Sequence, residues 1–153
     1  MRLLLLLAAS GCAVGGVDEP SGTSASQLGD SADAAIQLEG GGLWYRRVSC
    51  PSPSPATCID EGHFWVDLAI RNDAYAKRVG IVWTDRVRHT PWQLATGVYE
   101  APLADGFERW GVDVTTGTMT GIEPHPQIQL AAFVEMAGET HWDNNNGADY
   151  TLE

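Results

Sequence analysis

The sequence predicts an all-β protein, folded as an antiparallel β-sandwich. Several short segments rich in β-branched and aromatic residues alternate between apolar and polar positions, which is the pattern of strands with one buried face. Clusters of Gly, Pro, Asn and Asp separate these segments, and none of the segments shows a long helical period. Strands of this spacing, spread over about 110 residues, are typical of a sandwich.

The expected strands lie between residue 43 and the C-terminus. The clearest alternation predicts one face with Phe64, Val66, Leu68 and Ile70, and an opposite face with Trp65, Asp67, Ala69 and Arg71. Similar patterns predict strands at 43–50, 77–85, 108–116 and 128–138, the last with Ile128, Leu130, Ala132, Val134 and Met136 on its apolar face. We expect about eight strands in all. We expect three tryptophans within strands to lie in the core: Trp65, Trp83 and Trp110. Trp44 is not assigned to core or surface.

The N-terminus resembles a bacterial lipoprotein signal. Arg2 precedes a run of leucines, and small residues then lead to Cys12, the residue that would carry the lipid. We expect residues 1–12 to be a lipoprotein-type signal peptide that leaves the protein lipid-anchored in the cell envelope, at the outer membrane or cell surface. A plain secretory signal and a secreted protein are the alternative. The apolar run is too short for a membrane-spanning helix.

Residues 13–41 are rich in Gly, Ser, Ala and Asp and contain no aromatic residue. Such a composition buries too little apolar area to order itself, so we expect a flexible tether. Its last part, 35–39, also has the composition of the start of an edge strand. The folded domain is then expected at 42–153.

The charge of the chain excludes some classes of partner. The formal net charge is −11 at pH 7. Nucleic acid and anionic lipid head groups both require a basic face, so we expect neither as a ligand. A neutral partner fits this charge, and we expect a monomer.

The cysteines of the domain predict a disulfide. Cys50 and Cys58 flank a proline-rich loop, and an even pair in an exported protein is expected to be oxidised. The 4 histidines are scattered without the spacing of metal ligands. The Asp143–Gly147 segment begins like a calcium loop but lacks the closing glutamate, because the chain ends first. We therefore expect no metal and no cofactor.

No catalytic constellation is visible in the sequence. There is no Gly-x-Ser-x-Gly elbow and no nucleotide-binding glycine loop. Acidic residues are plentiful, but a glycosidase needs two carboxylates at a set separation in space, which the sequence does not show. We expect no catalytic residues and a protein that is not an enzyme.

Two loops combine an aromatic residue with short polar groups. Trp142 is followed by Asp143 and the amides of Asn144–Asn146, and Tyr75 lies between Asn72 and Lys77. Pyranose rings have apolar C–H faces, which suit flat aromatic rings, and hydroxyl rims, which suit amides that both donate and accept. The composition of these loops therefore favours carbohydrate binding.

Three stretches carry a resemblance to a known family. They are VDLAIRNDAYAKRVGIVWTD (66–85), FERW (107–110) and AGETHWDNNNGADYTL (137–152). In this order they resemble the family 21 carbohydrate-binding modules, which include the starch-binding domains of some fungal glucoamylases and the glycogen-binding domains of the glycogen-targeting subunits of protein phosphatase 1. The resemblance covers about 43–153 of the chain.

The resemblance implies an immunoglobulin-like β-sandwich that binds α-1,4-glucans without hydrolysis. It assigns one sugar site to Asn72, Tyr75, Lys77 and Phe107, and a second to Trp92, Trp142 and Asn144. Val134 stands where the family often has a tyrosine, and the adjacent Phe133 is predicted to point to the opposite face. The alternative is an adaptor that docks another protein, although the sequence has no Arg-Val-x-Phe docking motif.

Overall fold

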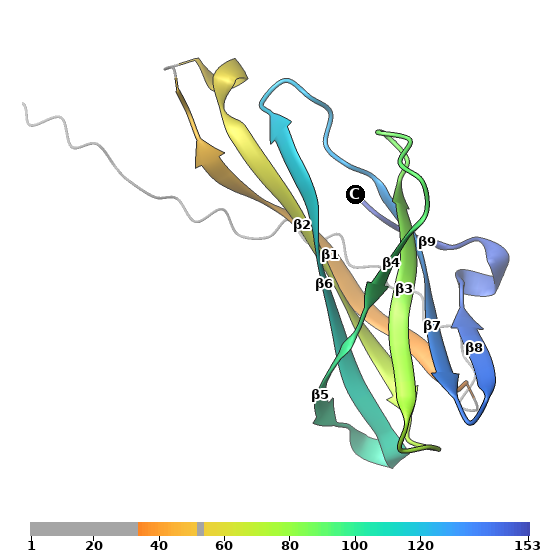
Figure 1. Ribbon diagram of the computed structural model, residues 1–153. Helices are drawn as coiled ribbons and strands as arrows, with labels where there is room; N and C mark the ends of the chain where they lie inside the picture. Colours follow the sequence, from red (N-terminus) through yellow and green to blue (C-terminus); the bar gives the residue numbers. More distant parts are fainter. Residues whose placement is uncertain (1–33, 52–53) are drawn as a thin grey trace, which may run out of the picture.

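The computed structural model describes residues 34–51 and 54–153 of the chain (Figure 1). The predicted signal peptide, Cys12 and most of the predicted tether lie outside these residues. The described part is all-β, with nine strands in two antiparallel sheets. It contains no α-helix, and hence no helix long and apolar enough to cross a membrane.

The two sheets form the predicted sandwich. The four-stranded sheet has the order β1-β2-β6-β5, and the five-stranded sheet has the order β4-β3-β7-β8, with β9 also paired to β7. The bounds are β1 (Ile36–Ser49), β2 (Ile59–Arg71), β3 (Lys77–Asp85), β4 (Gln93–Thr96), β5 (Val98–Pro102), β6 (Phe107–Thr120), β7 (Ile128–Met136), β8 (Glu139–Asp143) and β9 (Tyr150–Leu152). Single 3-10 turns occur at Pro55–Thr57, Ala104–Gly106 and Asn145–Gly147.

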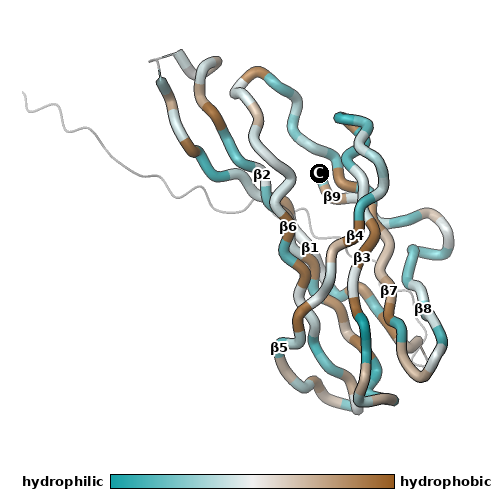
Figure 2. The backbone as a smooth tube through the Cα atoms, in the orientation of Figure 1, coloured by the Kyte–Doolittle hydropathy of each residue, from teal (hydrophilic) through white to brown (hydrophobic). Residues whose placement is uncertain are grey.

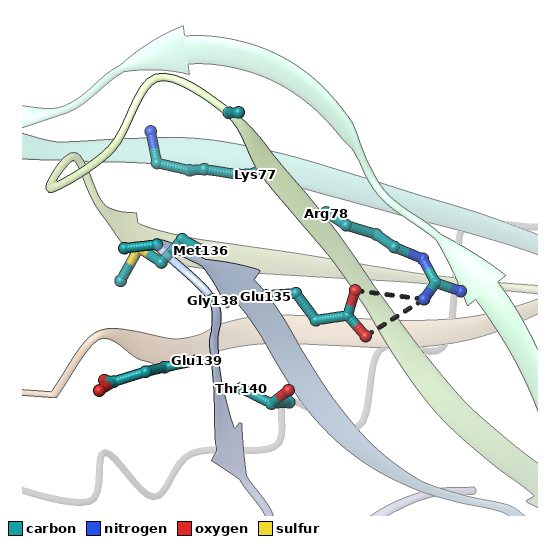
Figure 3. A pocket seen from close by; sticks show the side chains of 9 residues that line it. Lys77, Arg78, Glu135, Met136, Gly138, Glu139 and Thr140 are labelled. Atoms are coloured by element: carbon teal, nitrogen blue, oxygen red, sulfur yellow. Dashed lines mark hydrogen bonds and ion pairs between the residues drawn. The ribbon is translucent and has the colours of Figure 1, made fainter.

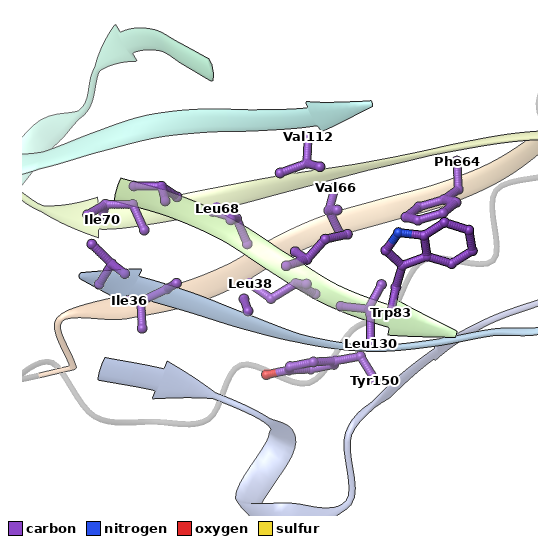
Figure 4. Close-up of a cluster of buried hydrophobic side chains, with 14 of the residues drawn as sticks. Ile36, Leu38, Phe64, Val66, Leu68, Ile70, Trp83, Val112, Leu130 and Tyr150 are labelled. Carbon is purple, nitrogen blue, oxygen red and sulfur yellow. The ribbon is translucent and has the colours of Figure 1, made fainter. Parts of the chain in front are cut away.

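The core lies between the facing sheets, on the apolar faces that the alternation predicted. From β2 it takes Phe64, Val66, Leu68 and Ile70, and from β7 it takes Ile128, Leu130, Ala132, Val134 and Met136. Figure 4 shows Trp83 of β3 against Phe64, with ring centroids 5.1 Å apart, and Tyr150 on the β7 side of the cluster. In Figure 2 the strands alternate in hydropathy, while the turn after β8 is hydrophilic.

Three features of the fold differ from the predicted elements. Strand β1 begins at Ile36, in the last part of the predicted tether, whose composition had suggested the start of an edge strand, because Ile36 and Leu38 are buried opposite Ile70 and Leu68. Strand β4 forms between the strands predicted at 77–85 and 108–116, where none was expected. Strand β6 continues to Thr120, beyond its predicted end at residue 116, because it pairs with the extended start of β2. Figure 1 shows the ends of β1, β2 and β6 reaching past the other sheet.

The predicted disulfide joins Cys50 to Cys58 and closes the hairpin between β1 and β2. The prediction that Trp65 lies in the core is wrong. Trp65 is only half-buried and lies on the outer face of the four-stranded sheet, because its neighbours Phe64 and Val66 occupy the inward positions. Trp83 is in the core as expected, and Trp110 packs partly buried against it.

Candidate functional site

The loop between β2 and β3 presents the first predicted group of residues. Tyr75 has a relative exposure of 104%, so its ring stands free of the sandwich. The backbone N–H of Asn72 donates to the carbonyl of Gly106 at 2.8 Å, which holds the loop beside the turn before β6. Phe107 opens β6 and lies half-buried opposite Arg71. The structure therefore brings Asn72, Tyr75 and Phe107 to one end of the sandwich.

Lys77 supports this loop from within. Its Nζ donates to Oδ1 of Asn72 at 2.7 Å and to Oε2 of Glu108 at 2.9 Å. The Lys77 side chain is only 2% exposed, so its charge faces the protein rather than solvent. The same Glu108 oxygen also accepts from Nε1 of Trp110 at 3.3 Å. Lys77 thus fixes Asn72 in place, and the amide NH2 of Asn72 is left as the group that can reach a ligand.

Trp142 dominates the second predicted group. It lies on β8 with a relative exposure of 53%, and β8 pairs with β7 so that Trp142 stands opposite Phe133. The two ring centroids are 5.4 Å apart, and the guanidinium of Arg78 lies 5.7 Å from the Phe133 centroid. Phe133 is buried beneath these two groups. It therefore braces the Trp142 ring in an outward position.

Phe133 points to the face opposite Val134, as the alternation predicted. Val134 faces the core and is fully buried, and Phe133 faces outward beside Trp142. The alternation of Ile128, Leu130 and Ala132 already assigned Val134 to the inward face. What the sequence could not show was the register between β7 and β8, which puts Trp142 on the same side as Phe133.

Asp143 anchors the loop that follows Trp142. One carboxylate oxygen accepts from the backbone N–H of Leu38 at 2.7 Å, and the other accepts from the Tyr150 hydroxyl at 2.8 Å. Burial, and then the bond to Asp143, raise the pKa of Tyr150 well above its usual value. Because this carboxylate is turned into the protein, the adjoining Trp142 is held outward.

The asparagines after Asp143 shape the turn. Oδ1 of Asn144 accepts from the backbone N–H of Gly147 at 3.1 Å, and Nδ2 of Asn145 donates to the carbonyl of Asp149 at 3.2 Å. Asn145 and Asn146 have φ values of 51° and 57°, a left-handed conformation that asparagine tolerates better than most residues. These amides hold the turn, and the NH2 of Asn144 forms no bond that would occupy it within the described residues.

Trp92 lies apart from Trp142. It precedes β4 and has a relative exposure of 52%. Strands β3 and β7 separate β4 from β8. The two tryptophans therefore lie near opposite edges of the five-stranded sheet, roughly 15 Å apart in the direction across the strands. No ring contact joins them in the described part of the chain. A ligand that touches both would have to be longer than a single sugar.

A shallow hollow lies beside the loop at Tyr75. Figure 3 shows it at the start of β3 and the turn from β7 to β8. Its volume is about 490 Å³. Arg78 donates to both oxygens of Glu135 at 3.1 and 3.2 Å along one wall, and Glu139 and Thr140 lie on the other. These charged and hydroxyl groups share the lining with the apolar Ala76, Met136 and Ala137.

The described residues show no group of three or more His, Cys, Asp or Glu that could hold a metal ion. The carboxylates nearest the two loops are also engaged. Glu108 is paired with Lys77, and Asp143 accepts from Leu38 and Tyr150. The two loops therefore offer aromatic faces and amides, and their carboxylates serve to hold the loops in place.

Two solved structures share this fold. The first is the starch-binding domain of Rhizopus oryzae glucoamylase, solved in complex with β-cyclodextrin and maltoheptaose: TM-score 0.54, 19% sequence identity, covering 81% of this chain and 97% of that one. The second is the carbohydrate-binding module of the muscle glycogen-targeting subunit of protein phosphatase 1: TM-score 0.52, 16% identity, covering 90% of this chain and 94% of that one.

No family model matches the sequence, and no curated protein matches it. The two structures belong to the two kinds of protein that the sequence resemblance named, so the resemblance is confirmed at the level of the fold.

Proposed function

We propose that this protein binds α-1,4-glucan chains, such as starch, glycogen and maltooligosaccharides, without hydrolysing them. The observation that carries this is Trp142, an exposed ring braced by Phe133 and followed by a turn of amides. A ring fixed in this way loses little entropy when it stacks on a pyranose. The two carbohydrate-binding modules of the same fold support the same class of ligand.

The loop at Tyr75 would supply a second point of contact. Tyr75 offers a free ring, with Asn72 and Phe107 beside it on the same end of the sandwich. Each site is open and shallow, so we expect affinities on the order of micromolar to millimolar per site. Two sites on one polymer raise the apparent affinity through effective concentration.

Affinity electrophoresis in glycogen gels tests the function. The full chain should be retarded, Trp142→Ala and Tyr75→Ala should each be retarded less, and the double variant should lose retardation disproportionately. Tyr99→Ala, which removes an exposed ring outside both loops, is the matched control and should migrate like wild type. A folded wild type that no α-glucan retards would reject this function and favour a protein-docking adaptor.

We further propose that acylation of Cys12 holds the domain at the cell envelope. The support is the run of leucines followed by Ala9-Ser10-Gly11-Cys12. Lipid chains on this residue would move the protein into a detergent phase. A Cys12→Ser variant that stays equally in the membrane fraction would contradict the anchor without affecting the glucan proposal.

A further inference from the structure

The outer face of the four-stranded sheet carries two indole rings that neither candidate loop uses. Trp44 of β1 pairs with His63 of β2, and Gly42 of β1 pairs with Trp65 of β2. Both tryptophans are half-buried and point away from the core. Diagonal neighbours of this kind are roughly 7–8 Å apart or slightly closer, so the two indoles occupy neighbouring positions on one face.

Trp65 lies against β1, where two glycines leave room for it. A Cβ placed on Gly42 would be 2.9 Å from Nε1 and 3.2 Å from Cε2 of Trp65. A Cβ on Gly40 would be 3.9 Å from the far edge of the same ring. The indole therefore lies along both glycines, and a side chain at Gly42 would displace it.

Trp44 is fixed by a stack on His63. The ring centroids are 4.1 Å apart and the planes differ by 8°. His63 is itself held at both nitrogens, with Nε2 2.9 Å from Oε2 of Glu61 and Nδ1 3.3 Å from Oγ1 of Thr115. Both indoles are thus already ordered before any ligand arrives, which lowers the entropy cost of stacking on them.

Two unpaired carboxylates flank the rings. Asp113 of β6 pairs with Trp65, and Asp67 follows Trp65 on the same face of β2. Within the described residues neither carboxylate takes part in an ion pair or a side-chain hydrogen bond. An ionised carboxylate only accepts hydrogen bonds, so its ligand must donate them. The negative charge disfavours anionic partners, and neutral hydroxyl groups fit it.

This face is continuous with the loop at Tyr75. Phe107 and Arg71 lie on the same outer face, and β2 runs from Arg71 to Trp65 over roughly 20 Å. A chain of several glucose units that is held at Phe107 can follow β2 along this face to the two indoles. A free monosaccharide cannot make both contacts.

We propose that Trp44 and Trp65 form a third saccharide-binding surface, on which pyranose rings of an α-glucan chain stack while Asp67 and Asp113 accept hydrogen bonds from their hydroxyls. This inference rests on the proposed function, because it takes the same polymer as ligand. It adds a site on the opposite sheet from Trp142, so the two sheets would hold separate stretches of chain.

The test uses the full chain with Tyr75→Ala and Trp142→Ala as background. In glycogen gels this background should keep weak retardation, and adding Trp44→Ala should lower its affinity by a further threefold or more. Asp67→Asn with Asp113→Asn should lower it about twofold, since the shape is kept and only the charged acceptors are lost. Val48→Ala, on the same strand but away from the rings, is the control and should change nothing.

Suppose that, in this background, the folded Trp44→Ala variant and the variant with Asp67→Asn and Asp113→Asn are retarded as much as the background itself. This result overturns the third surface and leaves the proposed function intact. A folded wild type that glycogen does not retard overturns both. If the protein is retained on cationic chitosan but not on glycogen, and Trp44→Ala abolishes this retention, the ligand of the third surface is an amino-sugar polymer and the proposal of a neutral glucan is overturned.

Discussion

The two candidate loops are held to the sandwich in different ways. The loop at Tyr75 depends on one buried cation, Lys77, which ties Asn72 to Glu108, and its aromatic ring has no support. The loop at Trp142 is tied by Asp143 to two separate strands, and its aromatic ring rests on Phe133. The first loop therefore has a fixed base and a free ring, while in the second both are fixed.

This difference predicts unequal affinities. A free ring such as Tyr75 must lose rotamer freedom when a sugar stacks on it, at a cost of about 0.5–1.5 kcal/mol. Trp142 has already lost most of that freedom on folding. We therefore expect the Trp142 loop to supply most of the affinity for short oligosaccharides, and the Tyr75 loop to matter chiefly on polymers.

The largest expected effect is on stability, in a Lys77→Met variant. The change leaves the Glu108 carboxylate in a largely buried position without its cation, so unfolding should become easier by about 3 kcal/mol. Arg78→Met is the matched control, because its pair with Glu135 is exposed and contributes about 1 kcal/mol or less. Denaturant unfolding measures both. Equal losses in the two variants would show that Lys77 does not hold the first loop as described.

Reduction of the Cys50–Cys58 disulfide should cost about 2–3 kcal/mol, because a short loop is released in the unfolded chain. The bond lies at the far end of the β1–β2 hairpin from the Tyr75 loop (Figure 1). Sugar affinity should therefore stay the same once the reduced protein is confirmed to be folded. A loss of affinity on reduction would mean that the hairpin end contributes to one of the loops or to the surface at Trp44 and Trp65.

Tyr150→Phe should loosen the attachment of the second loop without leaving a cavity in the core. The ring remains, but Asp143 loses the hydroxyl that donates to it, so unfolding should become easier by about 1.5 kcal/mol. Affinity for maltoheptaose should fall about threefold, since Trp142 is then less well held. Thermal unfolding and titration measure the two effects. A stability loss with unchanged affinity would separate Asp143 from the positioning of Trp142.

Stability should also depend on pH in the alkaline range. Burial, with the negative charge of Asp85 adding to it, raises the pKa of Tyr45 to about 12, and the pKa of Tyr150 is also raised. The unfolded chain loses these protons near pH 10 while the folded protein keeps them. Stability is therefore present below pH 10 and declines as the pH rises toward 12. The stability of Tyr150→Phe should decline less steeply over this pH range. An unfolding midpoint that does not change with pH would contradict the burial of these hydroxyls.

The sequence predicted the strand faces and the two loops, because these depend on local alternation and turn chemistry. It predicted the disulfide because an even pair of cysteines in an exported protein is expected to be oxidised. It could not predict contacts between distant segments. The inward turn of Lys77 depends on Glu108 in another strand, and the anchoring of Asp143 depends on Leu38 near the start of the fold. Alternation along the strand placed Trp65 on the face opposite Phe64 and Val66, and hence outward. The prediction was wrong because it followed the general preference of tryptophan for the core instead.

The most direct test of the central claim is calorimetric titration of the full chain with maltoheptaose, beside Trp142→Ala and Tyr75→Ala. We expect binding on the order of micromolar to millimolar, an approximately tenfold loss of affinity for Trp142→Ala, a loss of about threefold for Tyr75→Ala, and maltoheptaose recovered intact. Absence of binding by the folded wild type, or release of shorter oligosaccharides, would contradict it.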